Sequence, residues 1–381
     1  MRSMNENLRI LAFFLHPCKY GEYVGGAERR FLEITTRLKK LGVEMVALEY
    51  KPSLAREWGY LSYSSIEIDR RFINHSILEA IRVTLRGIIE CVKDKFDIIY
   101  VPSRGIFGYS DITNLVSAYV VSLLFRKPLI VVFHHLAQSD YSCSYFDEIV
   151  KGLTQRHAQV CIAVSRATAN DVIETFRVKR LIVSPNGVDL KSFRKLPSTL
   201  KLYDAVFFGR VMEEKGIPNL LKAWKIVITQ LPNAKLLLLG GSTPQAKETY
   251  IEIINRVGLS RNVVLSGFVP DEEAICLLNS SQIFVLPSKA EGFGLTIVEA
   301  MAVGLPCILS DIPALRENFH SAAVFVEPQN PNQLAQAILT LLSDPEKRRK
   351  LANKGQKLVK HFSWDAVAEK ELEVLKSVTK H

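Results

Sequence analysis

The feature of this sequence that most constrains its fold is a regular alternation of short apolar runs with longer segments of helical periodicity. Each run is rich in Val, Ile and Leu, and the segment that follows carries its apolar residues at the spacing of one helix face. Strands that are apolar at nearly every position are typical of parallel sheets covered by helices on both faces. In the first half of the chain the runs are 8–15, 43–50, 96–103, 128–135, 159–165 and 180–188.

One interruption of this alternation predicts the division into domains. The stretch 189–201 is polar and contains a proline, and the strands and helices restart directly after it at 203–210. We interpret 189–201 as an interdomain linker. A length of 381 residues also favours two domains over one. We therefore predict an α/β fold of two tandem Rossmann-like, doubly wound domains over 1–190 and 201–361. A C-terminal helix over 362–381 is expected to pack back toward the first domain.

Composition argues against several classes of protein. The six cysteines are scattered without a Cys-x-x-Cys pair, which argues against a zinc site and a disulfide framework and favours a reducing cytoplasm. No apolar run reaches the length of a bilayer span, and 8–15 is predicted as a buried strand rather than a signal peptide. The net charge of +10 suits an anionic membrane surface, a phosphorylated substrate or nucleic acid. Because the sequence has no zinc finger or RNA-recognition motif, we expect no nucleic-acid partner.

Several loops that follow predicted strands carry residues suited to binding phosphate. Ligands of doubly wound sheets bind beyond the carboxyl ends of the strands, so we expect the site in the cleft between the domains. Arg210 is the last residue of the predicted strand 203–210, and Lys215 lies in the loop after it. Two cations at this position can bind a diphosphate. Taken alone, they are better interpreted as solvated surface cations. Gly25 and Gly26 follow the first strand and could approach the same phosphates. They lack the G-x-G-x-x-G spacing of a dinucleotide site, which weakens a dehydrogenase interpretation.

The segment EGFGLTIVE joins a glycine turn to the start of an apolar helix. Consecutive backbone N–H groups from Gly292 to Leu295 would open this helix and favour an anion there. A tight turn that needs glycine for its positive φ would show the same residues. Glu291 and Glu299 bracket the turn, and helix capping explains one such acid but not two.

These segments resemble glycosyltransferase family 4, the glycosyl transferases group 1, whose enzymes have the GT-B fold. EGFGLTIVE matches the family's E-x7-E element, GRVMEEKG its Gly-Arg…Lys-Gly loop, and LSGFVPDEE its base-side loop. The C-terminal half matches nearly from end to end, and the N-terminal half matches at loops such as AVSRAT and NGVD. The resemblance implies an N-terminal acceptor-binding domain and a C-terminal nucleotide-sugar-binding domain. It also implies a retaining transferase for a hexose-type sugar, with no cofactor and no obligatory metal.

The resemblance implies a role for each matching residue. Glu299 accepts hydrogen bonds from the ribose hydroxyls, and Glu291 faces the hydroxyls of the sugar. Arg210 and Lys215 neutralise the pyrophosphate as it leaves, in place of a metal ion. The backbone amides against sugar and phosphate are those of Gly292, Phe293, Gly294 and Leu295.

Two further contacts to the donor follow from the resemblance. A histidine near the sugar is expected after the strand 128–135, where His134 is favoured and His135 is the alternative; one of the two is expected to be structural. Its role is to donate to a sugar hydroxyl rather than to act as a base. Phe268 and Val269 are expected to present backbone to the nucleobase.

We predict a cytoplasmic enzyme that uses a nucleotide-sugar donor and a glycan, lipid-linked or small-molecule acceptor. The alternatives are a nucleotide-sugar epimerase, a phosphorolytic enzyme, and a non-catalytic GT-B protein that binds a nucleotide sugar or a glycan. The segment 70–95 is basic with an apolar stripe. It is either a helix that dips into an anionic membrane at its cytoplasmic face or, as we favour, a helix that covers the sheet.

Overall fold

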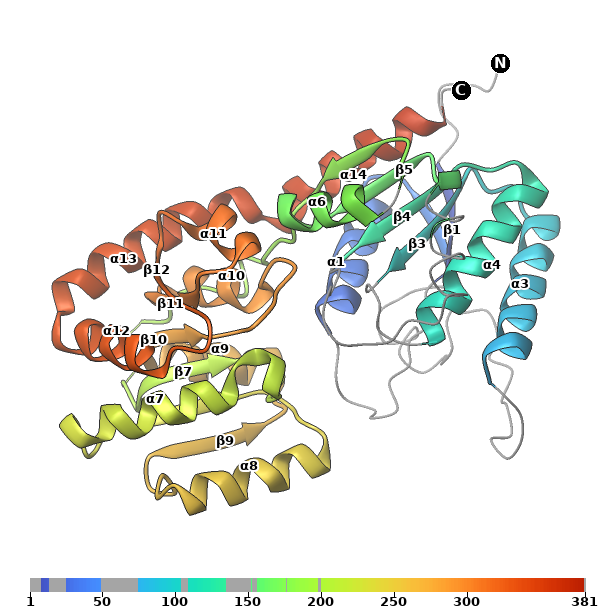
Figure 1. The fold of residues 1–381 in the computed structure, drawn as a ribbon. Helices are drawn as coiled ribbons and strands as arrows, with labels where there is room; N and C mark the ends of the chain where they lie inside the picture. Colours follow the sequence, from blue (N-terminus) through green and yellow to red (C-terminus); the bar gives the residue numbers. More distant parts are fainter. Residues whose placement is uncertain are drawn as a thin grey trace. The chain divides into compact units, whose positions relative to one another are not determined.

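The computed structural model describes residues 8–13, 25–48, 75–103, 109–134, 152, 156–175, 177–197 and 200–379, apart from the side chains of 75–79, 109–113 and 175. The chain divides into two compact units, Met1–Pro185 with Trp364–His381, and Asn186–Ser363. Each unit contains one parallel sheet of six described strands with helices around it (Figure 1). The predicted fold class, two doubly wound α/β domains in tandem, is confirmed.

The first unit follows the predicted alternation of strands and helices. Its sheet has the strand order β2-β1-β3-β4-β5-β6, and every neighbouring pair is parallel. The apolar run 128–135 gives a strand that is buried at every position, as its composition requires. The elements are β1 (Arg9–Phe13), α1 (Gly26–Lys40), β2 (Glu44–Leu48), α3 (His75–Lys93), β3 (Ile98–Ser103), α4 (Tyr109–Phe125), β4 (Leu129–Phe133), β5 (Val160–Ala163), α6 (Arg166–Thr175) and β6 (Leu181–Val183).

Helices cover both faces of this sheet. Successive strand residues point to opposite faces, so Ile99 and Val101 join the core beneath α3 and α4. Tyr100 points the other way and meets Phe31 of α1, with ring centroids 6.3 Å apart. In Figure 1, α3 and α4 lie together on one side of the sheet and α1 on the other. Of the helices that the structure describes, none is long and apolar enough to cross a membrane.

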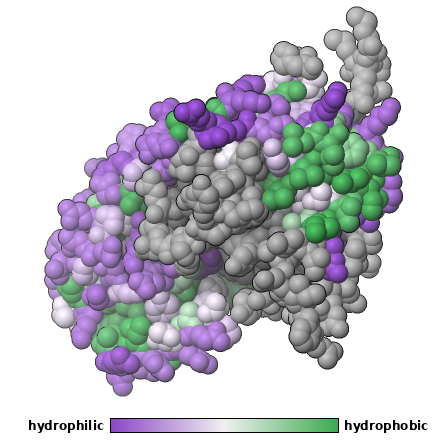
Figure 2. Space-filling view, turned by 45° about the vertical axis from the view of Figure 1, so that its right-hand side comes forward, coloured by the Kyte–Doolittle hydropathy of each residue, from purple (hydrophilic) through white to green (hydrophobic). Residues whose placement is uncertain are grey.

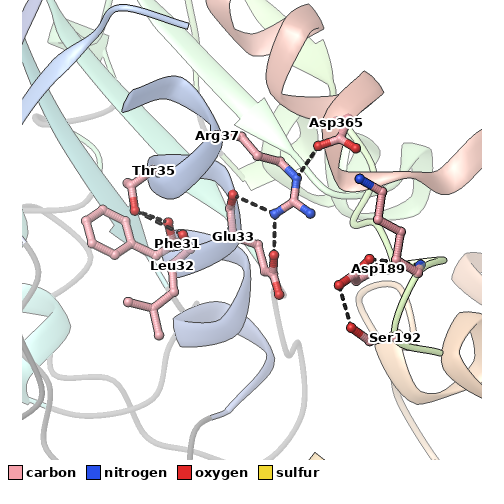
Figure 3. A network of polar contacts seen from close by, with 9 residues as sticks. Phe31, Leu32, Glu33, Thr35, Arg37, Asp189, Ser192 and Asp365 are labelled. Carbon is pink, nitrogen blue, oxygen red and sulfur yellow. Dashed lines mark hydrogen bonds and ion pairs between the residues drawn. The ribbon is translucent and has the colours of Figure 1, made fainter. Parts of the chain in front are cut away.

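The C-terminal helix α14 (Trp364–Val378) belongs to the first unit and packs along α1. Figure 3 shows Arg37 of α1 reaching Asp365 at the start of α14, with Nε 2.6 Å from the carboxylate. Deeper in the unit, Arg30 and Glu371 form an ion pair whose side chains are 1% and 0% exposed. The hydroxyl of Ser184, just after β6, donates to the same carboxylate at 3.1 Å. These contacts attach the end of the chain to its first helix.

The second unit repeats the architecture. Its sheet has the order β12-β11-β10-β7-β8-β9, again with parallel neighbours. The strands are β7 (Tyr203–Phe208), β8 (Leu236–Leu239), β9 (Val263–Gly267), β10 (Ser281–Leu286), β11 (Cys307–Ser310) and β12 (Ala323–Val326). The helices are η1 (Glu213–Lys215), α7 (Ile217–Gln230), α8 (Pro244–Arg256), α9 (Asp271–Asn279), α10 (Leu295–Ala302), α11 (Pro313–Phe319), α12 (Pro331–Ser343), α13 (Pro345–Leu358) and η2 (Val359–Phe362).

The stretch 189–201, which we interpreted as a linker, is packed against the second unit. Asn279 at the end of α9 accepts a hydrogen bond from the Leu196 amide at 2.8 Å and donates to the Arg194 carbonyl at 3.2 Å. The Phe193 side chain is buried. Slightly upstream, the Val188 amide donates to the Phe362 carbonyl at 2.7 Å. These bonds explain why the division falls after Pro185, a few residues before the predicted linker.

Candidate functional site

The loop after β7 begins where two strand ends touch through their backbones. The Gly209 amide donates to the Leu239 carbonyl at 2.9 Å. A Cβ atom on Gly240 would lie only 2.0 Å from the Gly209 carbonyl oxygen, so the close approach requires a glycine. Arg210 comes next and is exposed. Within the described residues its guanidinium forms no hydrogen bond or ion pair, so its donors are available to a ligand.

Lys215 and Glu291, predicted from separate motifs, are brought together at this end of the sheet. The Lys215 Nζ atom lies 2.6 Å from the Glu291 Oε1 atom, and the two side chains are 19% and 10% exposed. The Ser288 hydroxyl donates to the same oxygen at 2.8 Å. The Glu291 carboxylate is therefore held from two sides, by a cation and by a hydroxyl.

Backbone and surface contacts join the two loops that carry this pair. The Lys289 amide donates to the Glu214 carbonyl at 2.9 Å. The Lys289 ammonium lies 2.8 Å from Glu213 and lowers the pKa of that carboxyl. Gly216, with φ of +77°, lets the first loop turn directly against the carbonyl of Pro287. The loop after β7 and the loop after β10 thus form one connected structure.

The glycine turn opens helix α10 as the sequence predicts. Gly294 is the N-cap residue with φ of +92°, so the N-cap position itself carries no side chain that could cap the helix. Phe293 is buried and packs edge-on against Phe319 and Phe362, with centroids 5.7 and 5.4 Å away. This packing fixes the turn, and the start of the helix favours an anion near the amides of 292–295.

The two glutamates stand on either side of the N-cap position of α10. Glu299 is the fifth residue of α10, beyond the first turn, and is 3% exposed. Glu291 lies three residues before the N-cap, and the two contacts described above hold its carboxylate. Neither acid is the N-cap residue of α10, which is Gly294.

The remaining predicted residues lie at the ends of other strands. Phe268 follows β9 and is 48% exposed, and Val269 beside it is half-buried. In the first unit, His134 follows β4, is half-buried, and donates its amide to the Ser103 carbonyl at 3.1 Å. The alternative, His135, lies outside the described residues.

Gly25 and Gly26 stand at the start of α1, where Gly25 is the N-cap residue. A Cβ atom on Gly25 would lie 2.4 Å from the Glu28 Oε2 atom, so a carboxylate of the first turn already lies against this helix end. A negative charge already lies close to the amides where a phosphate was predicted to bind.

Sequence reasoning did not single out Ser288. The available signal was a small hydroxyl residue two positions after the apolar run of β10, at the carboxyl edge where ligands bind. No cluster of three or more His, Cys, Asp or Glu side chains that could hold a metal ion occurs among the described residues.

Comparison with protein families matches both halves of the chain. The model for glycosyl transferases group 1 matches residues 189–358, and the model for glycosyltransferase family 4 matches residues 24–192. A GDP-mannose:cellobiosyl-diphosphopolyprenol alpha-mannosyltransferase from Xanthomonas oryzae is 30% identical over 195 residues, 50% of this chain and 51% of that protein. The matched region spans about half the length of the first curated relatives, between 42% and 51%.

Solved structures share the fold over nearly the whole chain. A sucrose-phosphate synthase from Thermosynechococcus elongatus has a TM-score of 0.82 and 20% identity, covering 98% of this chain and 99% of that one. Anabaena HepE, solved in complex with UDP and glucose, has a TM-score of 0.79 and 21% identity, covering 97% and 100%. The architecture is therefore the GT-B fold.

Proposed function

Because this chain belongs to the GT-B glycosyltransferases of family 4, the glycosyl transferases group 1, we propose that it transfers a hexose-type sugar from a nucleotide-diphosphate sugar. The observation that carries the proposal is the contact between Lys215 and Glu291. It joins a phosphate-binding cation to the acid expected to face the sugar, at the carboxyl edge of the second sheet. Anabaena HepE binds UDP and glucose on the same fold, which supports a donor of this class.

Each end of the donor has a matching group in the second unit. We assign the sugar hydroxyls to Glu291 and the ribose hydroxyls to the buried Glu299. The amides of 292–295 at the start of α10, whose N-cap residue is a glycine, are assigned to phosphate and sugar. Backbone at Phe268 and Val269 is assigned to the nucleobase. In the first unit, His134 is assigned as a donor to a sugar hydroxyl.

The chemical step requires charge neutralisation at the leaving group. The bond between the anomeric carbon and the diphosphate oxygen breaks, the acceptor oxygen bonds to that carbon, and the proton of the acceptor hydroxyl passes to the departing diphosphate. Negative charge grows on the departing diphosphate, where Arg210 and Lys215 supply positive charge. These two cations support our proposal that the enzyme needs no metal ion. Retention of configuration is proposed from the family resemblance alone.

The acceptor class is proposed from charge and from a relative. The Xanthomonas relative is named for a diphosphopolyprenol-linked acceptor, and the net charge of +10 suits an anionic surface. We propose a lipid-linked glycan acceptor and peripheral association with the cytoplasmic face of a membrane.

The donor proposal is tested by binding and by turnover. UDP-, GDP- and ADP-sugars are screened for thermal stabilisation, since a ligand of the native state raises the melting temperature. Donor consumption is then followed with a lipid-linked acceptor for the wild type and for Lys215→Ala. We expect kcat to fall about 100-fold or more, as when one group that stabilises transition-state charge is removed.

The matched control is Lys289→Ala, which removes the other ion pair between the same two loops. Lys289 pairs with Glu213, which is largely exposed, so its loss should leave turnover within about threefold of wild type. Equal losses in both variants would show that loop stability, and not the charge of Lys215, supports turnover. Donor binding without any transfer would favour a non-catalytic binding protein.

A further inference from the structure

Helix α3 has one face packed into the first unit. Gly87 allows this packing, since a Cβ atom there would lie 2.6 Å from the Phe13 ring and 3.0 Å from Val121 of α4. Thr84 donates its hydroxyl to Ser117 of α4 at 3.0 Å. The side chains that pack on the core from this face are Val83, Ile88 and Cys91. The prediction that 70–95 contains a helix that covers the sheet is therefore confirmed.

A second apolar stripe on α3 faces away from the sheet. Large apolar side chains are 45–73% exposed along it, and two leucines at the end of α4 are 47% and 61% exposed. Figure 2 shows hydrophobic side chains gathered on this part of the first unit. We call this set the outer stripe; its members are Ile81, Leu85, Ile89, Val92, Leu123 and Leu124. At 3.6 residues per turn, the four on α3 fall within about 80° of the helix circumference.

Cations lie directly beside the outer stripe. By the same helical geometry, Arg82, Arg86 and Lys93 occupy the next roughly 40° of α3. Arg126 follows α4 and is exposed. Lys127 is close enough to Cys91 to lower the pKa of that thiol, although burial raises it more. A basic row along an apolar stripe is the pattern of a helix that lies in a membrane interface.

Two acidic side chains near the C-terminal end of α3 that the structure describes already have cationic partners. Glu90 is buried and pairs with Arg86 at 2.9 Å and with Lys93 at 3.9 Å. Asp94 pairs with Arg9 at 3.2 Å. Arg82 and Arg126 form no ion pair with any described residue. Among the described side chains around the outer stripe, the unpaired charge is positive.

We propose that the outer stripe, with Arg82, Lys93, Arg126 and Lys127 around it, is the surface by which this protein binds an anionic membrane. The apolar side chains enter the headgroup region, and the cations meet lipid phosphates and other anionic headgroups. The inference deepens the proposed function, because it rests on the peripheral membrane association proposed there and assigns it to one surface.

A second copy of the chain would fit the outer stripe less well than an anionic membrane does. Two-fold contacts place the same patch on both partners. Such a contact would bring Arg82 and Arg126 of one copy, which form ion pairs with no described side chain, toward those of the other, which is unfavourable. An anionic bilayer complements both the apolar stripe and the charge.

The test is co-sedimentation of the full chain with vesicles of phosphatidylcholine alone and with about 30% phosphatidylglycerol. We expect binding to the anionic vesicles only. Leu85→Glu with Val92→Glu, and separately Arg82→Glu with Arg126→Glu, should each weaken it at least about tenfold. The matched control is Ile173→Glu, on α6 of the same unit and 57% exposed, which should leave binding unchanged.

Several outcomes would overturn the proposal. If the wild-type protein does not bind anionic vesicles, or if the stripe variants bind them as well as wild type does, the outer stripe is not a membrane-binding surface. A wild-type dimer that the stripe variants convert to monomers, without vesicle binding, would assign the surface to a second copy. Thermal stabilisation by the nucleotide sugar is measured on every variant. If the wild type is stabilised by a nucleotide sugar but does not bind anionic vesicles, only this inference is refuted. If no nucleotide sugar stabilises the wild type, the proposed donor chemistry is refuted.

Discussion

Replacing Gly216 by alanine tests how the two loops of the candidate site are joined. Gly216 ends η1, begins α7, and has φ of +77° and ψ of 19°. Its Cα faces the loop after β10, and an added Cβ would lie 1.9 Å from the Pro287 carbonyl oxygen and 2.7 Å from its carbon. Both atoms are backbone at the end of a buried strand, so neither can move by a change of rotamer.

The expected cost has two parts. Left-handed backbone costs an alanine about 1–2 kcal/mol relative to the right-handed region. The second part is steric, because Cβ would have to move by 1.1 Å to reach even 3.0 Å from the carbonyl oxygen. Overpacking of this kind costs about 1–3 kcal/mol. We expect Gly216→Ala to destabilise the second unit by about 2–5 kcal/mol in total.

Gly258 offers a control that separates the two parts. Its φ is +76°, nearly that of Gly216, and an added Cβ would meet nothing within 4 Å. Gly258→Ala should therefore show the conformational cost without the clash, about 1 kcal/mol after allowing for the stiffer unfolded chain. The difference between the variants, about 2 kcal/mol, measures the contact with Pro287.

The assay combines unfolding with turnover. Urea unfolding is followed by circular dichroism for both variants, and donor consumption is measured at a temperature where both are folded. We expect Gly216→Ala to lose turnover as well as stability, because Lys215 is the preceding residue and its contact with Glu291 depends on the loop. Equal destabilisation of the two variants, or full turnover in Gly216→Ala, would refute the reasoning.

Two further predictions concern the first unit. Glu371→Leu leaves the Arg30 guanidinium buried without its partner, so we expect a loss of about 3–5 kcal/mol in urea unfolding; a loss below about 1 kcal/mol would contradict the role of the pair. Burial, aided by Lys179, lowers the pKa of His157 below its ordinary value of 6.5. The unfolded chain then binds the proton more readily, so stability should fall as pH drops from about 7 through 6.5 and lower. His157→Gln should show a shallower dependence over that range, and an unchanged slope would exclude His157 as its source.

The fold was predictable because its signal is local. The run LIVVF of β4 is buried at every position, and such runs specify covered parallel strands without knowledge of their neighbours. The order of strands is a different matter. β10 lies between β11 and β7, and its partner β7 lies 78 residues earlier in sequence, as in the pairing of Ile283 with Ala205. No single strand carries that information.

The domain division was less predictable for the same reason. A polar, proline-containing stretch is typical of a linker, and 189–201 fits that description. In the structure, however, this stretch is bound to the second unit, because the Leu196 amide donates to the side chain of Asn279, 83 residues away in sequence. An asparagine at a helix end has no local feature that identifies such a partner.

The candidate site divides in the same way. The glycine turn and the helix after it could be predicted, because Gly294 and the apolar residues of α10 are neighbours in sequence. The approach of Lys215 to Glu291 spans 76 residues and depends on how β7 and β10 pair. The family resemblance assigned both residues to one donor. The structure adds the Ser288 hydroxyl as a second partner of the Glu291 carboxylate.

Helix α3 shows why periodicity alone could not choose between the two interpretations of 70–95. Covering a sheet and meeting a membrane both require an apolar stripe, and this helix carries apolar residues around more than half of its circumference. The close approach at Gly87 decides which of them face inward, because only a side without a Cβ can pack so near Phe13 and Val121. Once that side is known, Leu85 and Val92 must point away from the core, with Arg82 and Lys93 beside them. The two interpretations therefore describe different faces of one helix, and only the outward face needs a partner outside the chain.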